Sequence, residues 1–293
     1  MQACLQLNTL HLSHLHGQDP YPVSSIIICA DDFAITPEIS EGITRLAVRS
    51  RISATSVMSL SPHWPANAKL LQSVKHQIDV GLHVDFTSEY AIQQGQGASL
   101  GAIMLKTCLR QMVPADIVAH LNRQFDLFEA HHGAPPQHVD GHQHVHQFPM
   151  IRDALVNVMA HRYPNAHMPW LRISKIPSHQ MNVKAAVINA MGANSLQRLA
   201  TQQRIPCSSF LTGIYDFVGG ASGYSMLVQD CLSNVPTHTV LMCHPGLAGQ
   251  HAAPFPEARL WEQAFFQSHE FEEVMAKLQL RLVRGSQSLR PQD

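Results

Sequence analysis

The stretch SIIICADDF at residues 25–33 decides the fold that the sequence predicts. Its apolar run is uninterrupted, which is typical of a strand buried on both faces in a parallel sheet. The run ends abruptly at two carboxylates, Asp31 and Asp32. Thr36 and Pro37 then supply a helix N-cap and a first helical residue, and apolar residues recur at helical spacing over the next three turns. The sequence therefore predicts a βα unit with two acids at the end of its strand.

The same alternation of strands and helices repeats along the chain. Expected strands span residues 25–30, 54–58, 78–84, 138–142, 171–173, 208–211, 238–243 and 280–284. Expected helices follow Thr36 and span residues 66–74, 114–132, 150–161, 181–203, 222–233 and 268–279. Seven or eight such repeats favour the α/β class and a TIM-barrel-like (β/α) barrel, which is allowed to be distorted or incomplete.

The domain organisation follows from this pattern. We expect one barrel domain over residues 23–285, a loosely ordered N-terminal extension over 1–22 and a C-terminal tail over 286–293. Residues 87–107 are rich in Gly, Gln and Ser without a clear periodicity, so they are expected to form a lid or binding loop. No internal repeat and no linker divides the chain.

Composition excludes several classes of protein. The 293 residues include 20 Lys and Arg against 21 Asp and Glu, so no basic surplus exists to bind nucleic acid. No apolar run approaches the ~20 residues of a membrane span. The six cysteines lack a metal-ribbon or disulfide spacing, and residues 1–22 lack the pattern of a signal peptide. We therefore expect a cytoplasmic protein without an integral membrane span.

Histidine is the compositional outlier, because its 20 copies equal Lys and Arg together. Neutral imidazole is the commonest metal ligand and titrates near physiological pH. The excess points to a metal or acid–base centre before any motif is considered.

Polar residues follow several of the expected strands, at the end of a barrel where reactive groups lie. These residues are Asp31, Asp32, His83, Asp140, His142, Arg172 and His244. Adjacent carboxylates that leave an apolar strand repel each other unless a cation or a shared proton compensates. The alternative for this pair is helix capping by one acid, with the other in solvent. The alternative for His83 is a hydrogen-bonded core residue.

The segment HVDGHQHVH at residues 138–146 is the strongest motif. If it stays extended, every second residue shares one face, which places four imidazoles and one carboxylate in a row. Such a row is hard to bury without a partner, and the alternative is a solvated loop.

One Asp and two His from separate strand ends form a facial ligand set that leaves metal coordination positions open for water and substrate. A metal held in this way activates water and polarises a carbonyl oxygen. A carboxylate beside the metal ligand would act as general base. His244, in the segment CHPG at residues 243–246, is a candidate acid for the leaving group, and its alternative is a buried turn histidine.

Five motifs in this order resemble the signatures of the YdjC-like carbohydrate deacetylase family, including its ChbG and HpnK types. The motifs are ADDF at 30–33, GLH at 81–83, DGHQHVH at 140–146, LR at 171–172 and MCHP at 242–245. The resemblance spans residues 24–285 and implies a TIM-barrel-like fold. One departure is Ala34, where the family usually has glycine.

The resemblance also implies roles for individual residues. A single divalent ion, first of all Zn or Mg and otherwise Mn, Fe or Co, would be held by Asp32, His83 and His142. Asp31 would be the catalytic base and His244 the acid. The remaining polar residues would contact the substrate or form a second layer around the metal ligands. These residues are Arg172, Asp140, His144 and His146.

The implied reaction is hydrolysis of the N-acetyl group of an amino sugar. The substrate would be chito-oligosaccharide-like or a lipid-linked glycoside as in the hopanoid-associated branch, which suits the low surface charge. One rival is a barrel metallo-phosphoesterase or amidohydrolase, which the His-x-His pair at 142–144 also fits and which predicts two ions. A second rival is a non-enzymatic metal-binding protein that holds several weak ions. Whether the chain forms a homodimer is left open.

Overall fold

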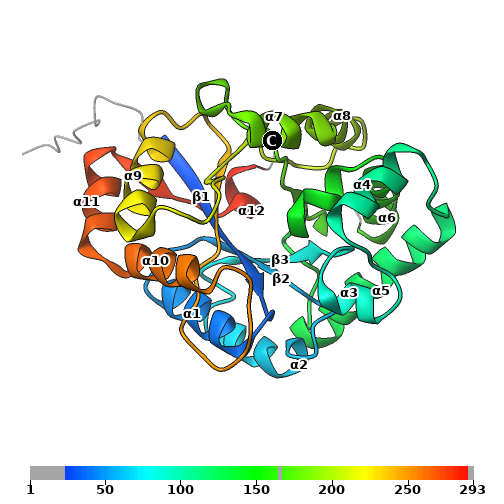
Figure 1. Cartoon of the computed structure of the whole chain (residues 1–293), viewed down its shortest axis with the longest axis horizontal. Helices are drawn as coiled ribbons and strands as arrows, with labels where there is room; N and C mark the ends of the chain where they lie inside the picture. The colour runs from blue at the N-terminus through cyan, green and yellow to red at the C-terminus, as the bar shows by residue number, and fades with distance from the viewer. Residues whose placement is uncertain (1–23, 164–166, 290–293) are drawn as a thin grey trace, which may run out of the picture.

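The protein is a barrel of parallel strands surrounded by helices. The computed structural model describes residues 24–163 and 167–289. Its strands are β1 (Ser24–Phe33), β2 (Ala54–Val57), β3 (Asp79–Val84), β4 (His138–Gly141), β5 (Trp170–Leu171), β6 (Phe210–Thr212), β7 (Thr239–Cys243) and β8 (Leu280–Leu282). They lie in the order β5-β4-β3-β2-β1-β7-β6, and β8 pairs with β1 (Figure 1).

Hydrogen bonds beyond the named strands close this sheet into a ring. A parallel bridge joins Leu171 to Cys207, which leads into β6. Farther along, the Leu211 N–H donates to the Lys175 carbonyl at 2.7 Å. β8 stays outside the ring, because it pairs only with the first three residues of β1. The expected TIM-barrel-like fold is therefore confirmed in an incomplete form, with seven strands in the ring.

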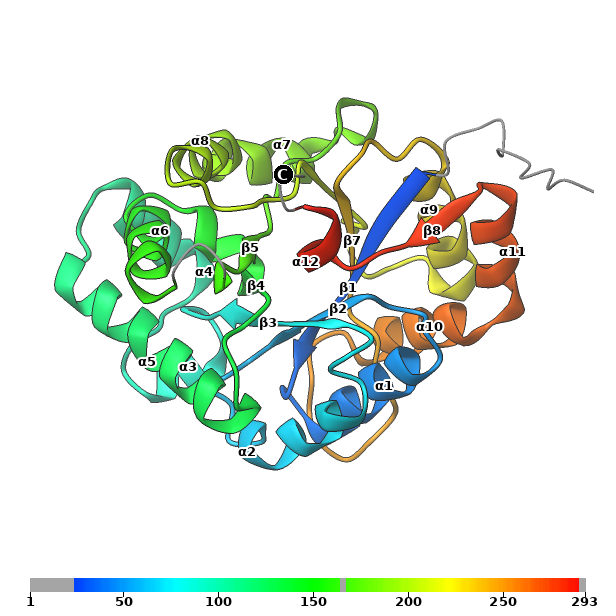
Figure 2. The same ribbon diagram turned by 180° about the vertical axis from the view of Figure 1, so that it is seen from behind.

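Helices form the outer layer in both views (Figures 1 and 2). They are α1 (Pro37–Val48), α2 (Trp64–Asn67), α3 (Glu89–Gln93), α4 (Leu100–Cys108), α5 (Pro114–His132), α6 (Ile151–Arg162), α7 (Val183–Ile188), α8 (Asn194–Gln202), α9 (Gly220–Ser233), α10 (Pro256–Gln267), α11 (His269–Lys277) and α12 (Gly285–Ser288). α1 begins as expected, because the Thr36 hydroxyl accepts a hydrogen bond from the Ile39 N–H at 3.3 Å. No helix in the described part of the chain has the length and apolar character needed to cross a bilayer.

Two predictions about local structure are wrong, and one helix was not predicted at all. Residues 87–107 contain α3 and the greater part of α4 instead of a loop without secondary structure. The segment 138–146 does not stay extended, because β4 ends at Gly141 and a turn of 3-10 helix, η2 (His142–Gln147), follows. Residues 256–267, which were not assigned to any element, form the three-turn helix α10.

The N-terminal end of the barrel is covered by the last described residues. In Figure 2, α12 lies over the middle of the ring. Asp79, at the start of β3, accepts hydrogen bonds from Trp170 and Ser286, so this end is fixed by polar contacts within a largely apolar floor. Residues 286–289, expected as the start of a tail, thus belong to α12 and the residue after it. The expected extension 1–22 and residues 290–293 lie outside the described residues.

Candidate active site

A bulge at the end of β1 turns the two acids toward the open end of the barrel. The register between β1 and β2 shifts between Ala30 and Phe33, and bulges of this kind re-aim side chains. Asp32 has a φ of 71° and Ala34 a φ of 73°, in the left-handed region that favours glycine. This conformation explains the glycine that the family usually has at position 34, and Ala34 adopts it at an energetic cost. Both carboxylates are buried.

Asp32, His83 and His142 come together at this end, as expected. Their ligand atoms lie within 4.8 Å of one another. Asp32 Oδ1 is 3.3 Å from His142 Nδ1 and 3.7 Å from His83 Nε2. Among the described residues this buried oxygen has no hydrogen-bond partner. A buried anion left unsatisfied beside two imidazoles fits a divalent cation, because the ion would supply the missing interaction.

The surroundings of the triad stabilise its charges and fix its rings. Burial alone would raise the pKa of Asp32, but the Arg259 guanidinium and the His142 ring hold that pKa well below its usual range. Asp140 Oδ1 lies 2.6 Å from His83 Nδ1, which leaves Nε2 directed at Asp32. Burial lowers the pKa of His83, yet the carboxylates of Asp140 and Asp31 outweigh it and raise this pKa to about 9. The carboxylate–histidine pair is the arrangement that commonly orients a metal-binding ring.

Asp31 is held by a fully buried arginine. Arg172, just after β5, donates from Nη1 to Asp31 Oδ1 at 2.7 Å and from Nη2 to Oδ2 at 2.8 Å. The same Nη1 lies 3.0 Å from Asp140 Oδ2. This two-point contact fixes the plane of the Asp31 carboxylate. Arg172 thus holds Asp31 and Asp140 together beside the triad.

The histidine row predicted at 138–146 does not share one face. Gln143 and His144 adopt left-handed backbone angles, which break the alternation of an extended chain. His138 lies in the barrel interior, where its Nε2 is 3.0 Å from the Ser56 hydroxyl. His146 turns back to contact the Arg172 carbonyl at 2.9 Å, and burial lowers its pKa to about 4.

His144 lines the same cavity as the triad. Its Nδ1 lies 3.1 Å from the Ser174 hydroxyl, and burial together with Arg172 holds its pKa well below the usual range. His144 and His146 therefore shape the turn that carries His142. Neither belongs to the group of converging ligand atoms that contains Asp32, His83 and His142.

His244 follows β7 and lines the same cavity as Asp31 and Asp32. Its ring meets Phe217 edge-to-face with centroids 5.3 Å apart. Burial lowers the pKa of His244 to about 4, and the nearby acids do not reverse the shift. The ring is therefore neutral at pH 7 in the free protein, whereas the sequence led us to expect a protonated donor.

The cavity above these residues has a volume of about 530 Å³. Besides the polar groups at its floor, its walls are mainly apolar side chains from α4, from α7 and the turn after it, from β7, and from the segments before α9 and α10. They are Leu100, Val187, Ile188, Met191, Ile214, Phe217, Met242 and Phe255. Phe217 and Phe255 stack with centroids 3.9 Å apart. A concave apolar cavity with a few converging polar groups is the usual form of a small-molecule site.

Two buried charged residues of the site were missed from the sequence. Arg259 and Glu262 both come from α10, and they contact Asp32 and the backbone of His244 respectively. Pro256 at the helix start and buried residues at helical spacing, such as Ala258 and Phe265, were the available signal for this helix.

Two further groups of candidate ligand atoms lie deeper in the barrel, Cys29–His138–Asp140 and Asp31–His83–Asp140. The Arg172 guanidinium already contacts both Asp31 and Asp140, so a cation occupies this region. Burial and the charge of Asp31 raise the pKa of the Cys29 thiol well above its usual range, which disfavours the thiolate that binds metal. The structure thus favours one ion over the two that the phosphoesterase or amidohydrolase rival requires.

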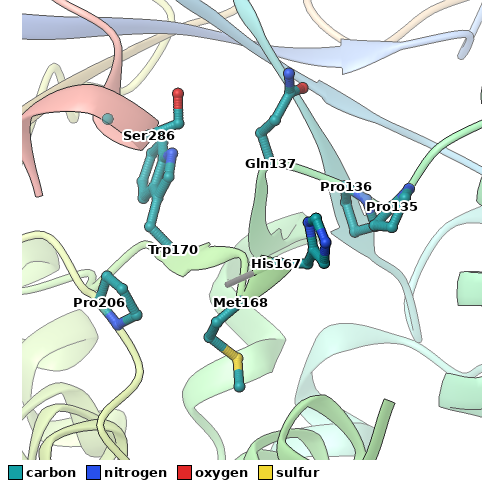
Figure 3. Close-up of a pocket in the computed structure, with 9 residues that line it drawn as sticks. Pro135, Pro136, Gln137, His167, Met168, Trp170, Pro206 and Ser286 are labelled. Atoms are coloured by element: carbon teal, nitrogen blue, oxygen red, sulfur yellow. The ribbon is translucent and has the colours of Figure 1, made fainter. Parts of the chain in front are cut away.

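A smaller cavity of about 130 Å³ lies at the opposite end of the barrel (Figure 3). Trp170 and Ser286 project side by side into this view, with Gln137 and His167 opposite. Among the described residues that line it, His167 is the one histidine, and none carries a carboxylate. The chemistry of the molecule is therefore concentrated at the carboxyl ends of the strands.

The chain is similar to several proteins named as deacetylases. The chain is 26% identical to a carbohydrate deacetylase of Danio rerio over 270 residues, which cover 79% of this chain and 84% of that protein. It is 28% identical to a carbohydrate deacetylase of Mus musculus over 143 residues, 45% of this chain and 46% of the relative. A chitooligosaccharide deacetylase of Proteus mirabilis is 28% identical over 131 residues, 43% of this chain and 51% of the relative. The chain thus matches only about half the length of the last two.

A solved structure supports the fold. The crystal structure of a candidate cellobiose-phosphate cleavage protein from Enterococcus faecalis V583 superposes with a TM-score of 0.68 at 16% identity, over 90% of this chain and 98% of the other. The family model described as YdjC-like protein matches residues 25–277, which include the Asp pair, the triad, Arg172 and His244. The chain therefore belongs to the YdjC-like protein family.

Proposed function

We propose that this protein is a metal-dependent carbohydrate N-deacetylase that hydrolyses the N-acetyl group of an amino sugar. The observation that carries the proposal is the convergence of Asp32, His83 and His142 beside the Asp31–Arg172 pair, at the floor of a substrate-sized cavity. The names of the relatives from Danio rerio and Proteus mirabilis support the same chemistry.

The ion site is built from Asp32 Oδ1, His83 Nε2 and His142 Nδ1, whose mutual distances are short and whose acid oxygen is otherwise unsatisfied. A bound divalent cation would lower the pKa of a water molecule and polarise the amide carbonyl. Three protein ligands leave room for water and substrate, which is typical of a catalytic site and not of a structural one.

The residues around the ion site divide the proton transfers. Asp31, oriented by Arg172, accepts a proton from the attacking water. As the water oxygen bonds to the acetyl carbon, the carbon–nitrogen bond breaks and the amine nitrogen needs a proton. His244 supplies it: burial lowers the pKa of the free ring to about 4, so the ring takes up a proton from solvent within the substrate complex and passes it to the amine. Asp31 returns to solvent the proton that it took from water. The products are acetate and a free amino sugar.

The walls of the cavity indicate which amino sugars fit. Sugar hydroxyls need hydrogen-bond partners, whereas most of the wall above the triad is aliphatic or aromatic. Val187 and Phe255 line the cavity and are about half exposed, so its apolar surface reaches the rim. A lipid-linked glycoside therefore fits the cavity better than a chito-oligosaccharide does.

The test is release of acetate by the metal-loaded protein. We expect release from alkyl glycosides of N-acetylglucosamine, loss of release after chelation, and loss in Asp31→Asn. Asp153→Asn, which removes an exposed charge on α6, serves as the matched control and should behave as the wild type. Absence of acetate release from every N-acetylated sugar tested, with the ion bound, would refute the proposal.

Substrate preference is measured in the same assay. Each buried methylene contributes about 0.8 kcal/mol, so kcat/KM should rise up to roughly tenfold for every two methylenes in the alkyl chain. Equal kcat/KM for a long alkyl glycoside and for an N-acetylglucosamine oligomer would instead favour the chito-oligosaccharide-like substrate.

A further inference from the structure

Helix α10 carries two buried charged side chains one turn apart, and both reach the active site. Arg259 and Glu262 are 3% and 0% exposed, although α10 belongs to the outer layer of the barrel. A buried ion is costly unless it is paired and hydrogen-bonded. The groups that these two side chains contact therefore indicate why both are buried.

Arg259 uses all three guanidinium nitrogens. Nη2 lies 2.5 Å from Asp32 Oδ2, Nη1 donates to the His244 carbonyl at 3.3 Å, and Nε donates to the Pro254 carbonyl at 2.9 Å. Because Asp32 Oδ2 is held in this way, Oδ1 is the oxygen left facing His83 and His142. Arg259 thus selects which oxygen of Asp32 is offered to a cation.

Glu262 holds the backbone of His244, the neighbouring residue of the site. One of its oxygens accepts a hydrogen bond from the backbone N–H of His244, and the other accepts from the Tyr215 hydroxyl at 2.6 Å. The His244 residue is therefore held at its N–H by Glu262 and at its carbonyl by Arg259. Its ring Nδ1 is buried without a hydrogen-bond partner among the described residues. The main-chain contacts, rather than a bond to this ring nitrogen, fix where the imidazole lies.

We propose that α10 is the positioning element of the active site, in which Arg259 orients Asp32 toward the cation and Glu262 holds His244 at the reacting atoms. This inference rests on the proposed function for the role of His244. Its metal-binding part does not depend on any substrate, so the two can fail separately.

The metal-binding part is tested with Zn²⁺ alone, by competition against a chromophoric chelator. Arg259→Lys keeps the positive charge and removes the three-point contact, so any loss reports geometry and not electrostatics. Loss of a group that orients a ligand weakens metal binding by 10–100-fold, and we expect about tenfold here. Glu262→Ala should leave Zn²⁺ affinity unchanged, as should Arg281→Lys, a control at an exposed arginine of β8.

The kinetic part separates positioning from folding. A displaced reacting group costs about 10²-fold, so Glu262→Ala should lower kcat by about that factor with KM unchanged. Glu262→Gln keeps an acceptor for the His244 N–H and should recover most of the lost kcat. Glu257→Ala, at an exposed position of the same helix, should match the wild type. If Glu262→Ala does not fold, Glu262→Asp, which keeps the charge but shortens the reach, should show the same loss of kcat.

Two results would overturn the proposal. One is wild-type Zn²⁺ affinity in Arg259→Lys together with wild-type kcat in Glu262→Ala. The other is an equal loss of Zn²⁺ affinity in both variants, which would mean that α10 only supports the fold around the site. A wild-type protein that releases no acetate would refute the proposed function, while the Zn²⁺ competition would still decide the role of Arg259.

Discussion

Each end of the barrel buries an aspartate beside an arginine, and the two aspartates differ in what their oxygens contact. At the closed end, Asp79 accepts from Arg284 at 2.9 Å, from Trp170 at 2.9 Å and from the Ser286 N–H at 2.7 Å, and both of its oxygens are satisfied. At the open end, Arg259 contacts one oxygen of Asp32, and the other oxygen is buried without a hydrogen-bond partner in the part of the chain that the structure describes. A fully satisfied buried carboxylate holds the structure together, whereas one with a free oxygen is available to a ligand.

The largest effect is expected at the open end. Asp32→Asn removes the anionic oxygen that faces the two imidazoles, so Zn²⁺ binding should weaken by more than about 100-fold, beyond the loss of an outer partner. Stability in urea should fall as well, because Asp32→Asn leaves the buried Arg259 guanidinium without its counter-charge. Metal analysis of the purified variant and urea unfolding measure the two quantities. Retention of one tightly bound ion by Asp32→Asn would contradict the difference drawn between Asp32 and Asp79.

At the closed end we expect a loss of stability without a loss of Zn²⁺ affinity. Asp79→Asn leaves the Arg284 guanidinium without its counter-charge and places an amide against the Trp170 and Ser286 donors. Breaking a buried pair of this kind costs about 3–5 kcal/mol, and the partial exposure of Arg284 places the expected loss near the lower limit. Zn²⁺ affinity should stay at the wild-type value. An Asp79→Asn variant with unchanged stability would show that the hydrogen bonds of Asp79 do not anchor α12.

Glu262 offers a pH-dependent contrast with Asp79. Burial raises the pKa of Glu262 to about 7 despite its hydrogen bonds, from 4.5 in an unfolded chain. Between these values the folded state binds the extra proton, so the free energy of unfolding falls as pH rises, by about 3 kcal/mol in total. Glu262→Gln lacks this contribution.

Urea unfolding at pH 5 and pH 8 checks this sign. The wild type should lose stability relative to Glu262→Gln on going from pH 5 to pH 8. An equal change in both proteins would contradict the burial-driven shift of the Glu262 pKa.

The smallest effect concerns the strained loop at the open end. Ala34 has a left-handed φ of 73°, which costs an L-residue roughly 1–2 kcal/mol relative to glycine. Ala34→Gly should therefore stabilise the protein by up to about 1 kcal/mol, since glycine also loses more chain entropy on folding. Urea unfolding measures the change; destabilisation by Ala34→Gly would mean that the Ala34 methyl group packs better than the strain costs.

The parts of the molecule that could be predicted from the sequence are those set by local pattern. The apolar run before Asp31 predicts β1, and parallel strands bring their carboxyl ends to one side, so one Asp and two His from separate strand ends could be grouped without coordinates. The family resemblance is what named Asp32, His83 and His142. Their convergence within 4.8 Å agrees with that argument.

The parts that could not be predicted depend on tertiary contacts. Arg259 and Glu262 are charged residues on an outer helix, where charge normally faces solvent, and only their partners on β1 and after β7 explain their burial. The turn after Gly141 arises from left-handed angles at Gln143 and His144, which no periodicity reveals. The ring closes through backbone at Cys207, outside any predicted strand.

The measurement that tests the central claim most directly is X-ray absorption spectroscopy at the zinc edge of the protein loaded with one Zn²⁺ per chain. Coordination by Asp32, His83 and His142 predicts a shell of nitrogen and oxygen atoms only, at about 2.0–2.2 Å, with the scattering pattern of two imidazoles. A sulfur scatterer near 2.3 Å would instead place the ion on Cys29 in the barrel interior and contradict the account.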